Sequence, residues 1–365
     1  MQSAKNRRAQ LSAAAVIALL ITCFAATAAP ADAFWPQWRG PLCTGAAPLA
    51  DPPQTWSETQ NVKWKSPIPG EGDATPVIWG GRVFLLTAVA TGKPNPSAPT
   101  LEAPAQPYQF TVLCLDRANG HVLWQKVARQ ETPHEGRQEN NTFASASPIT
   151  DGSVVLAFFG SRGLYCYDLD GGLKWHADFG KMKTRMGFGE GASPALSGNT
   201  IVVCWDDETE RDFIVALDKE TGKELWRTPR DEATGWSTPL VVGFQGQKQV
   251  VVNATKAVRS YDLATGKELW SCTGQTMNAI PSPVAASDVV YVTSGFRGAA
   301  LQAVRLGRSG DLTGSDAILW SHAKNTPYVP SPLLAGDFLY VIKGNDPILS
   351  CFNAKSGEPV FEPSA

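Results

Sequence analysis

The residues that could carry out chemistry are few and widely spaced. Of the seven cysteines, none is adjacent to another and none stands in a Cys-x-x-Cys pair, which excludes a zinc ribbon and a thioredoxin-like site. No Gly-x-Ser-x-Gly nucleophile elbow and no phosphate-binding glycine loop occurs. The histidines are too scattered for a metal cluster of recognisable spacing: His121, His134, His176 and His322. The sequence therefore predicts no catalytic residue and no metal site.

Two local features come closest to a binding site. His134 lies in a long loop, where ligand-binding residues concentrate, and is the histidine best placed to touch a ligand. The acidic run from Asp206 to Asp212 lacks the alternating spacing and the glycine of a calcium-binding EF-hand loop. We expect this run to form a solvated hairpin tip.

Composition limits the classes of protein that this chain can belong to. It has 365 residues, of which 43% are hydrophobic, and Lys+Arg 32 against Asp+Glu 34 leave it nearly neutral. These values exclude a disordered polyelectrolyte and argue against a basic nucleic-acid binder. The content of Gly 33 and Pro 27 leaves little room for long helices. We therefore expect an all-β protein.

Residues 1–33 have the pattern of an export signal. Basic residues come first, an apolar stretch from Leu11 to Ala26 follows, and Ala31-Asp-Ala33 provides a small-x-small cleavage site. Once this signal is removed, no apolar run has membrane-spanning length, so we expect a periplasmic or secreted protein. Two alternatives stay open: the apolar stretch is retained as a membrane anchor, or Cys23 carries a lipid.

The elements that would position any site come from an internal repeat. A segment that runs from Asp through Gly to Trp recurs, and from Trp64 onward its closing aromatic returns every 41–60 residues, near the roughly 40–45 residues of a propeller blade. A Ser-Pro or Thr-Pro pair precedes each copy. The repeat positions that we single out are Asp116, Trp124, Asp168, Trp175, Asp218, Gly222, Trp226, Asp262, Gly266, Trp270 and Trp320.

Each copy contains four short strands, and its residues have distinct structural roles. Asp and Gly form the hairpin before the last strand, because Gly tolerates a positive φ and Asp bonds back to the turn. Pro restricts the first strand to a sheet edge, and Trp is expected to pack between blades. Cys114, Cys166 and Cys351 share one small, buried position, which argues against disulfides among them. The pairing of Cys43, Cys204 and Cys272 stays open.

The repeat resembles that of PQQ-type, quinoprotein-like β-propellers, whose blade signature is Ala-x-Asp-x-x-Thr-Gly-Lys-x-x-Trp. Exported bacterial proteins with this repeat include outer-membrane assembly propellers and quinoprotein alcohol dehydrogenases. The segment from Phe34 to Pro41 is similar to the mature N-terminus of one exported group. The resemblance implies eight blades. Residues 74–365 supply six modules, and within the N-terminal segment 34–73 residues 61–66 look like an orphan closing strand. We therefore expect a C-terminally truncated chain and an open arc of blades.

In a propeller, ligands gather where loops enter the innermost strands, so the candidate site lies just before each Ser/Thr-Pro pair. Amide, guanidinium, carboxylate and aromatic groups occur there, a mixture suited to a polar ring or a peptide; the alternative is that they are ordinary loop residues. The candidates are Asn140, Asn141, Arg185, Glu190, Trp236, Asn278 and Tyr328.

These features favour a non-catalytic binding or assembly scaffold in the cell envelope. Its partner would be an envelope protein or a polymer, with no nucleic acid and no cofactor. The alternative is a dehydrogenase that uses PQQ and calcium to oxidise an alcohol or a sugar. The resemblance implies an adjacent-Cys disulfide for such enzymes, and this chain has no adjacent cysteines. Only Glu190 and Asn278 are available as calcium ligands there.

Overall fold

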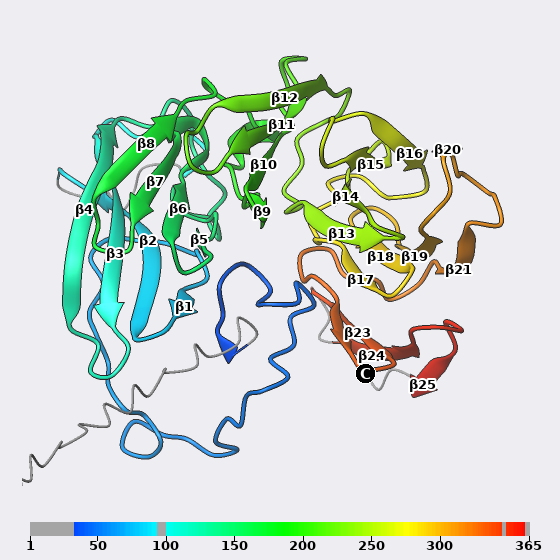
Figure 1. The fold of residues 1–365 in the computed structure, drawn as a ribbon, viewed down its shortest axis with the longest axis horizontal. Helices are drawn as coiled ribbons and strands as arrows, with labels where there is room; N and C mark the ends of the chain where they lie inside the picture. The colour runs from blue at the N-terminus through cyan, green and yellow to red at the C-terminus, as the bar shows by residue number, and fades with distance from the viewer. Residues whose placement is uncertain (1–32, 93–99, 345–347, 362–365) are drawn as a thin grey trace, which may run out of the picture. The chain divides into compact units, whose positions relative to one another are not determined.

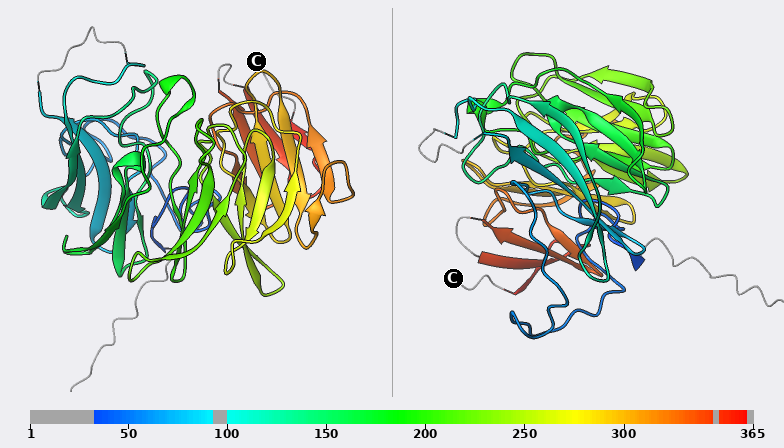
Figure 2. Two further views of the ribbon diagram at one scale, coloured as in Figure 1. Left: turned by 90° about the horizontal axis from the view of Figure 1, so that it is seen from above. Right: turned by 90° about the vertical axis from the view of Figure 1, so that its left-hand side faces the viewer.

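The computed structural model describes residues 33–92, 100–344 and 348–361, and Ala31–Ala365 forms one compact unit. Within it, six sheets built mainly of antiparallel strands follow one another in chain order along an arc (Figure 1). Figure 2 shows the same sheets from two further directions as successive twisted layers. This arrangement confirms the all-β propeller prediction. The predicted export signal lies outside the described residues, apart from Ala33. No described helix is long and apolar enough to cross a membrane.

Each sheet is one blade, numbered here 1 to 6. Blade 1 contains β1 (Val77–Trp79), β2 (Arg82–Ala90), β3 (Tyr108–Asp116) and β4 (Val122–Glu131). Blade 2 contains β5 (Ile149–Thr150), β6 (Val154–Phe158), β7 (Leu164–Asp168) and β8 (Leu173–Ala177). Blade 3 contains β9 (Ala195–Ser197), β10 (Thr200–Trp205), β11 (Phe213–Asp218) and β12 (Glu224–Pro229).

The remaining blades keep the same strand order. Blade 4 contains β13 (Leu240–Phe244), β14 (Gln247–Val252), β15 (Val258–Asp262) and β16 (Glu268–Cys272). Blade 5 contains β17 (Val284–Ala286), β18 (Val289–Ser294), β19 (Ala300–Arg305) and β21 (Ile318–His322). Blade 6 contains β22 (Leu333–Ala335), β23 (Phe338–Lys343), β24 (Ile348–Asn353) and β25 (Pro359–Phe361). The short β20 (Gly310–Asp311) joins blade 4 by pairing in parallel with β16.

The Ser/Thr-Pro pairs connect the innermost strands through one continuous series of hydrogen bonds. The backbone N–H of each Ser or Thr donates to the hydroxyl oxygen of the next one around the ring. The five bonds are Thr75 to Ser147 (3.0 Å), Ser147 to Ser193 (2.9 Å), Ser193 to Thr238 (3.0 Å), Thr238 to Ser282 (3.1 Å) and Ser282 to Ser331 (3.0 Å). We call these residues the hydroxyl ring.

The repeated Trp joins neighbouring blades, as predicted. Its indole packs on the glycine of the next blade's turn, and its Nε1–H donates to the carbonyl of the residue after that turn's Asp or Asn. Gly222 illustrates why glycine is required: its φ is 69°, and a Cβ there would lie 2.5 Å from the Trp175 ring. The bonds run from Trp124 to Leu169 (2.9 Å), Trp175 to Lys219 (2.8 Å), Trp226 to Leu263 (2.9 Å) and Trp320 to Ala354 (3.1 Å).

Trp270 departs from this pattern. Its Nε1–H donates to the side-chain oxygen of Gln249 in its own blade at 2.9 Å. In the next blade, the chain leaves β19 by a longer excursion through β20 before reaching β21, and Gly307 of that excursion packs against Phe244. The repeat position therefore predicts burial of Trp270 but not its partner.

The predicted orphan strand at 61–66 does not form, because this segment pairs with no described strand. Trp64 nevertheless occupies the blade-joining position. It packs on Gly120 of the first blade's turn and donates to the carbonyl oxygen of Arg117 at 3.0 Å. At the other end of the series, Phe361 takes the place of Trp and is exposed, as are Phe338 and Leu349 of the same blade.

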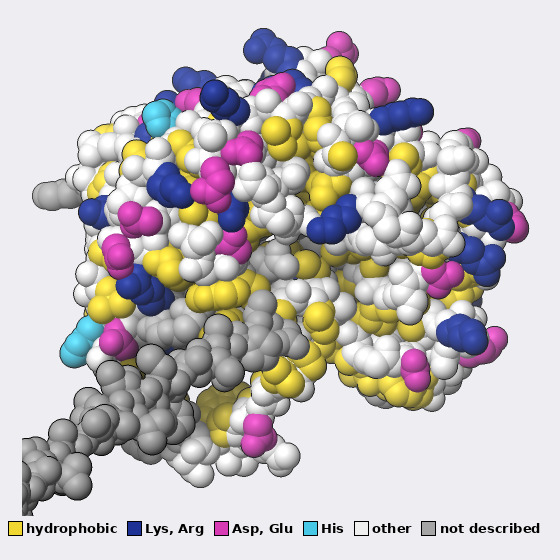
Figure 3. Space-filling model, viewed as in Figure 1, with side chains coloured by type: hydrophobic (Ala, Val, Ile, Leu, Met, Phe, Trp, Pro, Cys, Tyr) yellow, Lys and Arg dark blue, Asp and Glu magenta, His cyan; other side chains and the backbone are white. Residues whose placement is uncertain are grey.

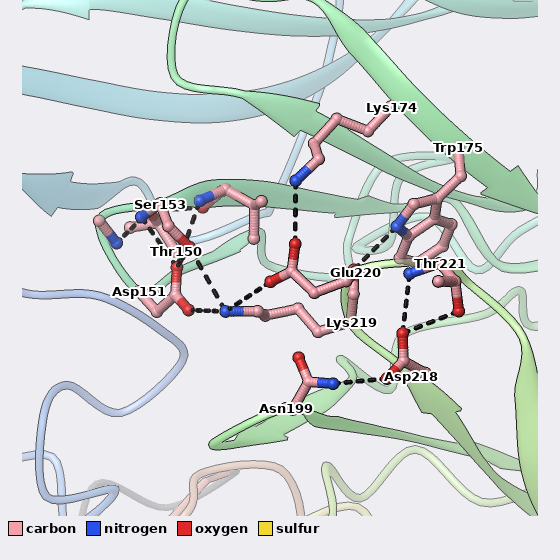
Figure 4. A network of polar contacts seen from close by, with 12 residues as sticks. Thr150, Asp151, Ser153, Lys174, Trp175, Asn199, Asp218, Lys219, Glu220 and Thr221 are labelled. Carbon is pink, nitrogen blue, oxygen red and sulfur yellow. Dashed lines mark hydrogen bonds and ion pairs between the residues drawn. The ribbon is translucent and has the colours of Figure 1, made fainter.

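Figure 4 shows the polar contacts around one such joint, between blades 2 and 3. Asp218 accepts hydrogen bonds from Thr221 inside the turn, and the neighbouring Lys219 reaches back to Asp151 at 2.6 Å. Burial alone would raise the pKa of Asp151, but the Lys219 ammonium and the Ser153 donors lower that pKa to about 2. The signature turn thus supplies both the packing and the charge of the joint.

The prediction of a solvated hairpin tip at Asp206–Asp212 is confirmed only for residues 208–211, which are exposed between the paired strands β10 and β11, and is wrong for the three aspartates. Asp206, Asp207 and Asp212 are buried. Asp206 forms a two-bond ion pair with Arg230, at 2.7 and 3.2 Å, and Arg230 also donates to the Tyr261 hydroxyl of blade 4 at 2.6 Å. Buried carboxylates need such partners, and here they come from loops distant in sequence.

Residues 34–45, which we call the strap, contact blades at both ends of the series. Trp35 pairs with Ile78 of blade 1, and the Thr150 N–H of blade 2 donates to Pro36. In blade 6, the Leu334 N–H donates to the Thr44 carbonyl at 3.1 Å. The strap therefore links the first and last blades directly.

Candidate functional site

A central cavity of about 880 Å³ opens where the loops enter the innermost strands. Four of the seven residues predicted from the sequence line it: Asn140, Asn141, Trp236 and Tyr328. They belong to the segments before blades 2, 4 and 6, so different blades deliver them to one place. The repeat positions them, although their types do not repeat.

The other three candidates lie outside the lining of this cavity. Glu190 faces a separate cavity of about 30 Å³, Arg185 donates its backbone N–H to Thr234 at 2.9 Å, and Asn278 is buried with a φ of 56°. Their positions before the Ser/Thr-Pro pairs were identified correctly, but sequence position alone did not determine which way each side chain turns.

Glu190 is occupied by a buried ion pair. Its carboxylate accepts from the Arg162 guanidinium at 2.9 Å and from the Ser161 backbone N–H at 2.6 Å. Burial raises the pKa of Glu190, and both donors oppose that rise. Arg162 also lies over Phe110 and Phe143, at 5.4 and 5.7 Å from the ring centroids. This ion pair connects the loop before blade 3, which carries Glu190, to blade 2.

Two further predicted residues also have structural partners. Asn141 donates to the Phe188 carbonyl at 2.9 Å and accepts from the Thr142 N–H, so it fixes the loop that carries Asn140. His134 is partly buried, and its Nε2 lies 2.6 Å from the Met182 carbonyl oxygen. His134 is absent from the lining of the central cavity.

The aromatic residues of the cavity are held in place by contacts of their own. Trp236 donates its Nε1–H to the Gly189 carbonyl at 2.8 Å and has Phe188 beside it. Tyr328 stacks on Phe296, with ring centroids 4.9 Å apart and planes inclined by 25°. The two aromatic faces are therefore largely fixed before anything binds.

Sequence reasoning missed the contribution of the strap. Trp38 and Arg39 line the central cavity, and Trp38 donates its Nε1–H to Ser282 of the hydroxyl ring at 3.3 Å. Arg39 donates to the carbonyls of Thr44 and Pro332, and burial lowers its pKa to about 10. The signals in the sequence were the density of aromatic residues and Pro in this segment and its similarity to the mature N-terminus of an exported group.

The same two strap residues also line a second cavity of about 430 Å³. This one contacts later residues of the inner strands, such as Leu196, Val242 and Ala286, whereas the central cavity contacts the residues that precede those strands. The two cavities adjoin one another, because Trp38, Arg39, Thr238 and Ser282 line both.

Two segments of the chain, residues 55–185 and 161–359, match the protein family described as outer membrane protein assembly factor BamB. This chain belongs to the BamB family. A comparison with curated proteins found no match.

The chain is also similar to several solved structures. A europium-containing methanol dehydrogenase gives a TM-score of 0.52 at 11% identity, covering 80% of this chain and 78% of that one. BamB from Moraxella catarrhalis gives a TM-score of 0.49 at 15% identity, covering 77% of this chain and 79% of that one. Quinohemoprotein alcohol dehydrogenase from Comamonas testosteroni gives a TM-score of 0.48 at 14% identity, covering 81% of this chain and 67% of that one. At these identities, the likeness to the methanol dehydrogenase supports the fold alone.

The donor set of this BamB-family cavity does not fit PQQ with calcium. PQQ carries three carboxylates, whereas the charged side chains lining the cavity are one cation, Arg39, and two anions, Asp73 and Glu139. Calcium takes six to eight oxygen ligands. Among the described residues, no group of three or more His, Cys, Asp or Glu side chains is arranged to hold a metal. Glu190, one of the two possible ligands named from the sequence, is paired with Arg162.

Proposed function

We propose that this protein is an exported, non-catalytic propeller that serves as a binding or assembly scaffold in the cell envelope. The observation that carries the proposal is the mouth of the central cavity, where fixed aromatic rings and exposed polar side chains meet. Such a concave site on a preformed scaffold is suited to binding. Membership of a family described as an outer membrane assembly factor supports the envelope setting.

The charge distribution is consistent with a partner other than nucleic acid. Lys and Arg side chains are interspersed with Asp and Glu over the face shown in Figure 3. A nucleic-acid binder requires a basic stripe or patch, because phosphate contacts dominate its affinity. We therefore expect an envelope protein or a polymer as the partner.

Position-specific photo-crosslinking in the native host tests this proposal. A photoreactive amino acid replaces Asn140 at the cavity mouth or, as the matched control, Leu225 on the outer strand β12; both side chains are exposed. We expect a discrete crosslinked product from position 140 and none from position 225. Equal products from both positions, or none from position 140, would contradict a scaffold that binds at the mouth.

The dehydrogenase alternative has its own test. The purified protein is supplied with PQQ and calcium, and reduction of an artificial dye is followed with alcohols and sugars as substrates. We expect no substrate-dependent turnover. Robust turnover that is abolished by Glu190→Gln would overturn the scaffold proposal.

A further inference from the structure

We propose that the central cavity binds a neutral carbohydrate, with sugar rings stacked on Trp236 and Tyr328. This inference rests on the proposed function and specifies the chemical class of the polymer. The cavity volume of about 880 Å³ lies within the range of about 300–1,000 Å³ typical of small-molecule sites, which suits a few sugar rings.

The first argument comes from the two aromatic residues. Sugar rings present flat apolar C–H faces, and fixed aromatic rings bury such faces at little cost in conformational entropy. Trp236 is held by Gly189 and Tyr328 by Phe296, and both line the cavity. The strap adds a third aromatic lining residue, Trp38, which Ser282 anchors.

The second argument comes from the hydroxyl ring. Ser147, Ser193, Thr238, Ser282 and Ser331 all line the cavity, and each hydroxyl oxygen accepts the N–H of the preceding ring member. A hydroxyl that accepts in this way still has its own proton to donate. The wall therefore offers a row of O–H donors to a ligand rich in oxygen acceptors, as a sugar is.

The hydrogen bonds of the hydroxyl ring argue against a peptide as the ligand of the central cavity. An extended peptide binds a sheet edge through main-chain hydrogen bonds. At the cavity wall, the ring N–H groups from Thr75 to Ser282 are already donated to the next hydroxyl, and the Pro after each has no N–H. The wall thus retains side-chain donors and few main-chain ones.

The rim supplies groups that match sugar hydroxyls and oppose anions. The Asn140 amide carries both hydrogen-bond donors and an acceptor, so it can pair with a sugar hydroxyl, which also donates and accepts. Asp73 and Glu139 also line the cavity, and neither forms an ion pair with any residue in the described ranges. Because the cavity lining contains two carboxylates and one cation, Arg39, it disfavours an anionic ligand and favours a neutral carbohydrate.

A glycan array carrying neutral and anionic glycans, followed by titration calorimetry with a soluble neutral hit, tests the inference on the full chain. We expect neutral glycans to bind in preference to anionic ones. Trp236→Ala should weaken binding by about tenfold, whereas Trp236→Phe, which keeps an aromatic face, should lose much less. Tyr328→Ala provides a second variant, and Trp56→Ala is the control, since Trp56 is 70% exposed and lies outside the cavity lining.

The outcomes separate this inference from the proposed function. No glycan binding, together with a crosslink from position 140, overturns the carbohydrate and leaves the scaffold standing. Binding that persists in both Trp236→Ala and Tyr328→Ala, or a preference for anionic glycans, also overturns the inference. Absence of both glycan binding and the position 140 crosslink contradicts the two proposals together. Circular dichroism of each variant confirms that lost binding does not reflect unfolding.

Discussion

The joints between blades repeat, whereas the mouth of the cavity does not. At the joints of Trp124, Trp175, Trp226 and Trp320, the same indole packs on the same turn and donates to the equivalent carbonyl. At the mouth, different blades deliver a carboxylate, an amide, an indole and a phenol, from Asp73, Asn140, Trp236 and Tyr328. A stabilising contact is needed at every joint, while a ligand needs different groups from different sides. Under the proposed function, the joints provide stability and the mouth provides recognition.

The largest effect is expected at the joint between blades 3 and 4, where the Arg230–Asp206 ion pair is buried. Arg230→Met would leave Asp206 without its partner in the interior, which should lower the free energy of unfolding by about 3–5 kcal/mol. Urea denaturation measures the change. Arg308→Met is the control, because its ion pair with Asp316 is exposed and should contribute at most about 1 kcal/mol. Equal losses in the two variants would contradict the importance of burial.

Removal of one repeated indole should have the next largest effect. Trp226→Ala opens a cavity against Gly266 and breaks the bond to Leu263, at a cost of about 3 kcal/mol in the free energy of unfolding. The exposed Trp56 provides the matched control, and Trp56→Ala should change the unfolding midpoint little. A loss of similar size from both variants would show that indole removal is harmful wherever it occurs.

The ion pair between Lys219 and Asp151 should make one joint sensitive to acid. The folded-state pKa of Asp151, about 2, lies below its usual value of 3.8. The stability from this shift is therefore fully present above pH 3.8 and is lost as the pH falls toward 2. Asp151→Asn should remove about 1 kcal/mol at neutral pH, and wild type and variant should converge in urea denaturation near pH 2. A difference that is unchanged by pH would contradict this origin.

The smallest effect on stability is expected at the mouth. Asn140→Ala removes an exposed side chain and should change the free energy of unfolding by no more than about 0.5 kcal/mol. In glycan titrations the same variant should bind more weakly than wild type. Loss of stability comparable to that of Trp226→Ala would remove the distinction between joint and mouth.

The repeat made the joints predictable and left the mouth partly hidden. Asp, Gly and Trp recur at fixed spacing, so the turn and the inter-blade packing of Trp175 on Gly222 followed from one copy compared with another. The mouth could be located from the Ser/Thr-Pro pairs, but the direction of each side chain could not. The Glu190 side chain pairs with Arg162, and the Asn278 side chain is buried. Partners distant in sequence decide these contacts.

Other contacts could not be predicted because they come from single occurrences. The strap has no second copy in the chain, so nothing in the sequence placed Trp38 against Ser282. The acidic run at Asp206 resembled a solvated tip because its partner, Arg230, lies beyond the next hairpin. Trp64 kept its repeat position even though its segment formed no strand, which shows that the indole joint is specified more locally than strand pairing.

The most direct test of the division between joint and mouth combines two tryptophan variants. Photo-crosslinking from position 140 and urea denaturation are both measured in the Trp226→Ala and Trp236→Ala backgrounds. We predict that Trp236→Ala loses the crosslinked product while keeping nearly wild-type stability, and that Trp226→Ala loses stability while its folded fraction still crosslinks. If Trp236→Ala crosslinks like wild type, or if both variants lose stability and crosslinking in proportion, the account is contradicted.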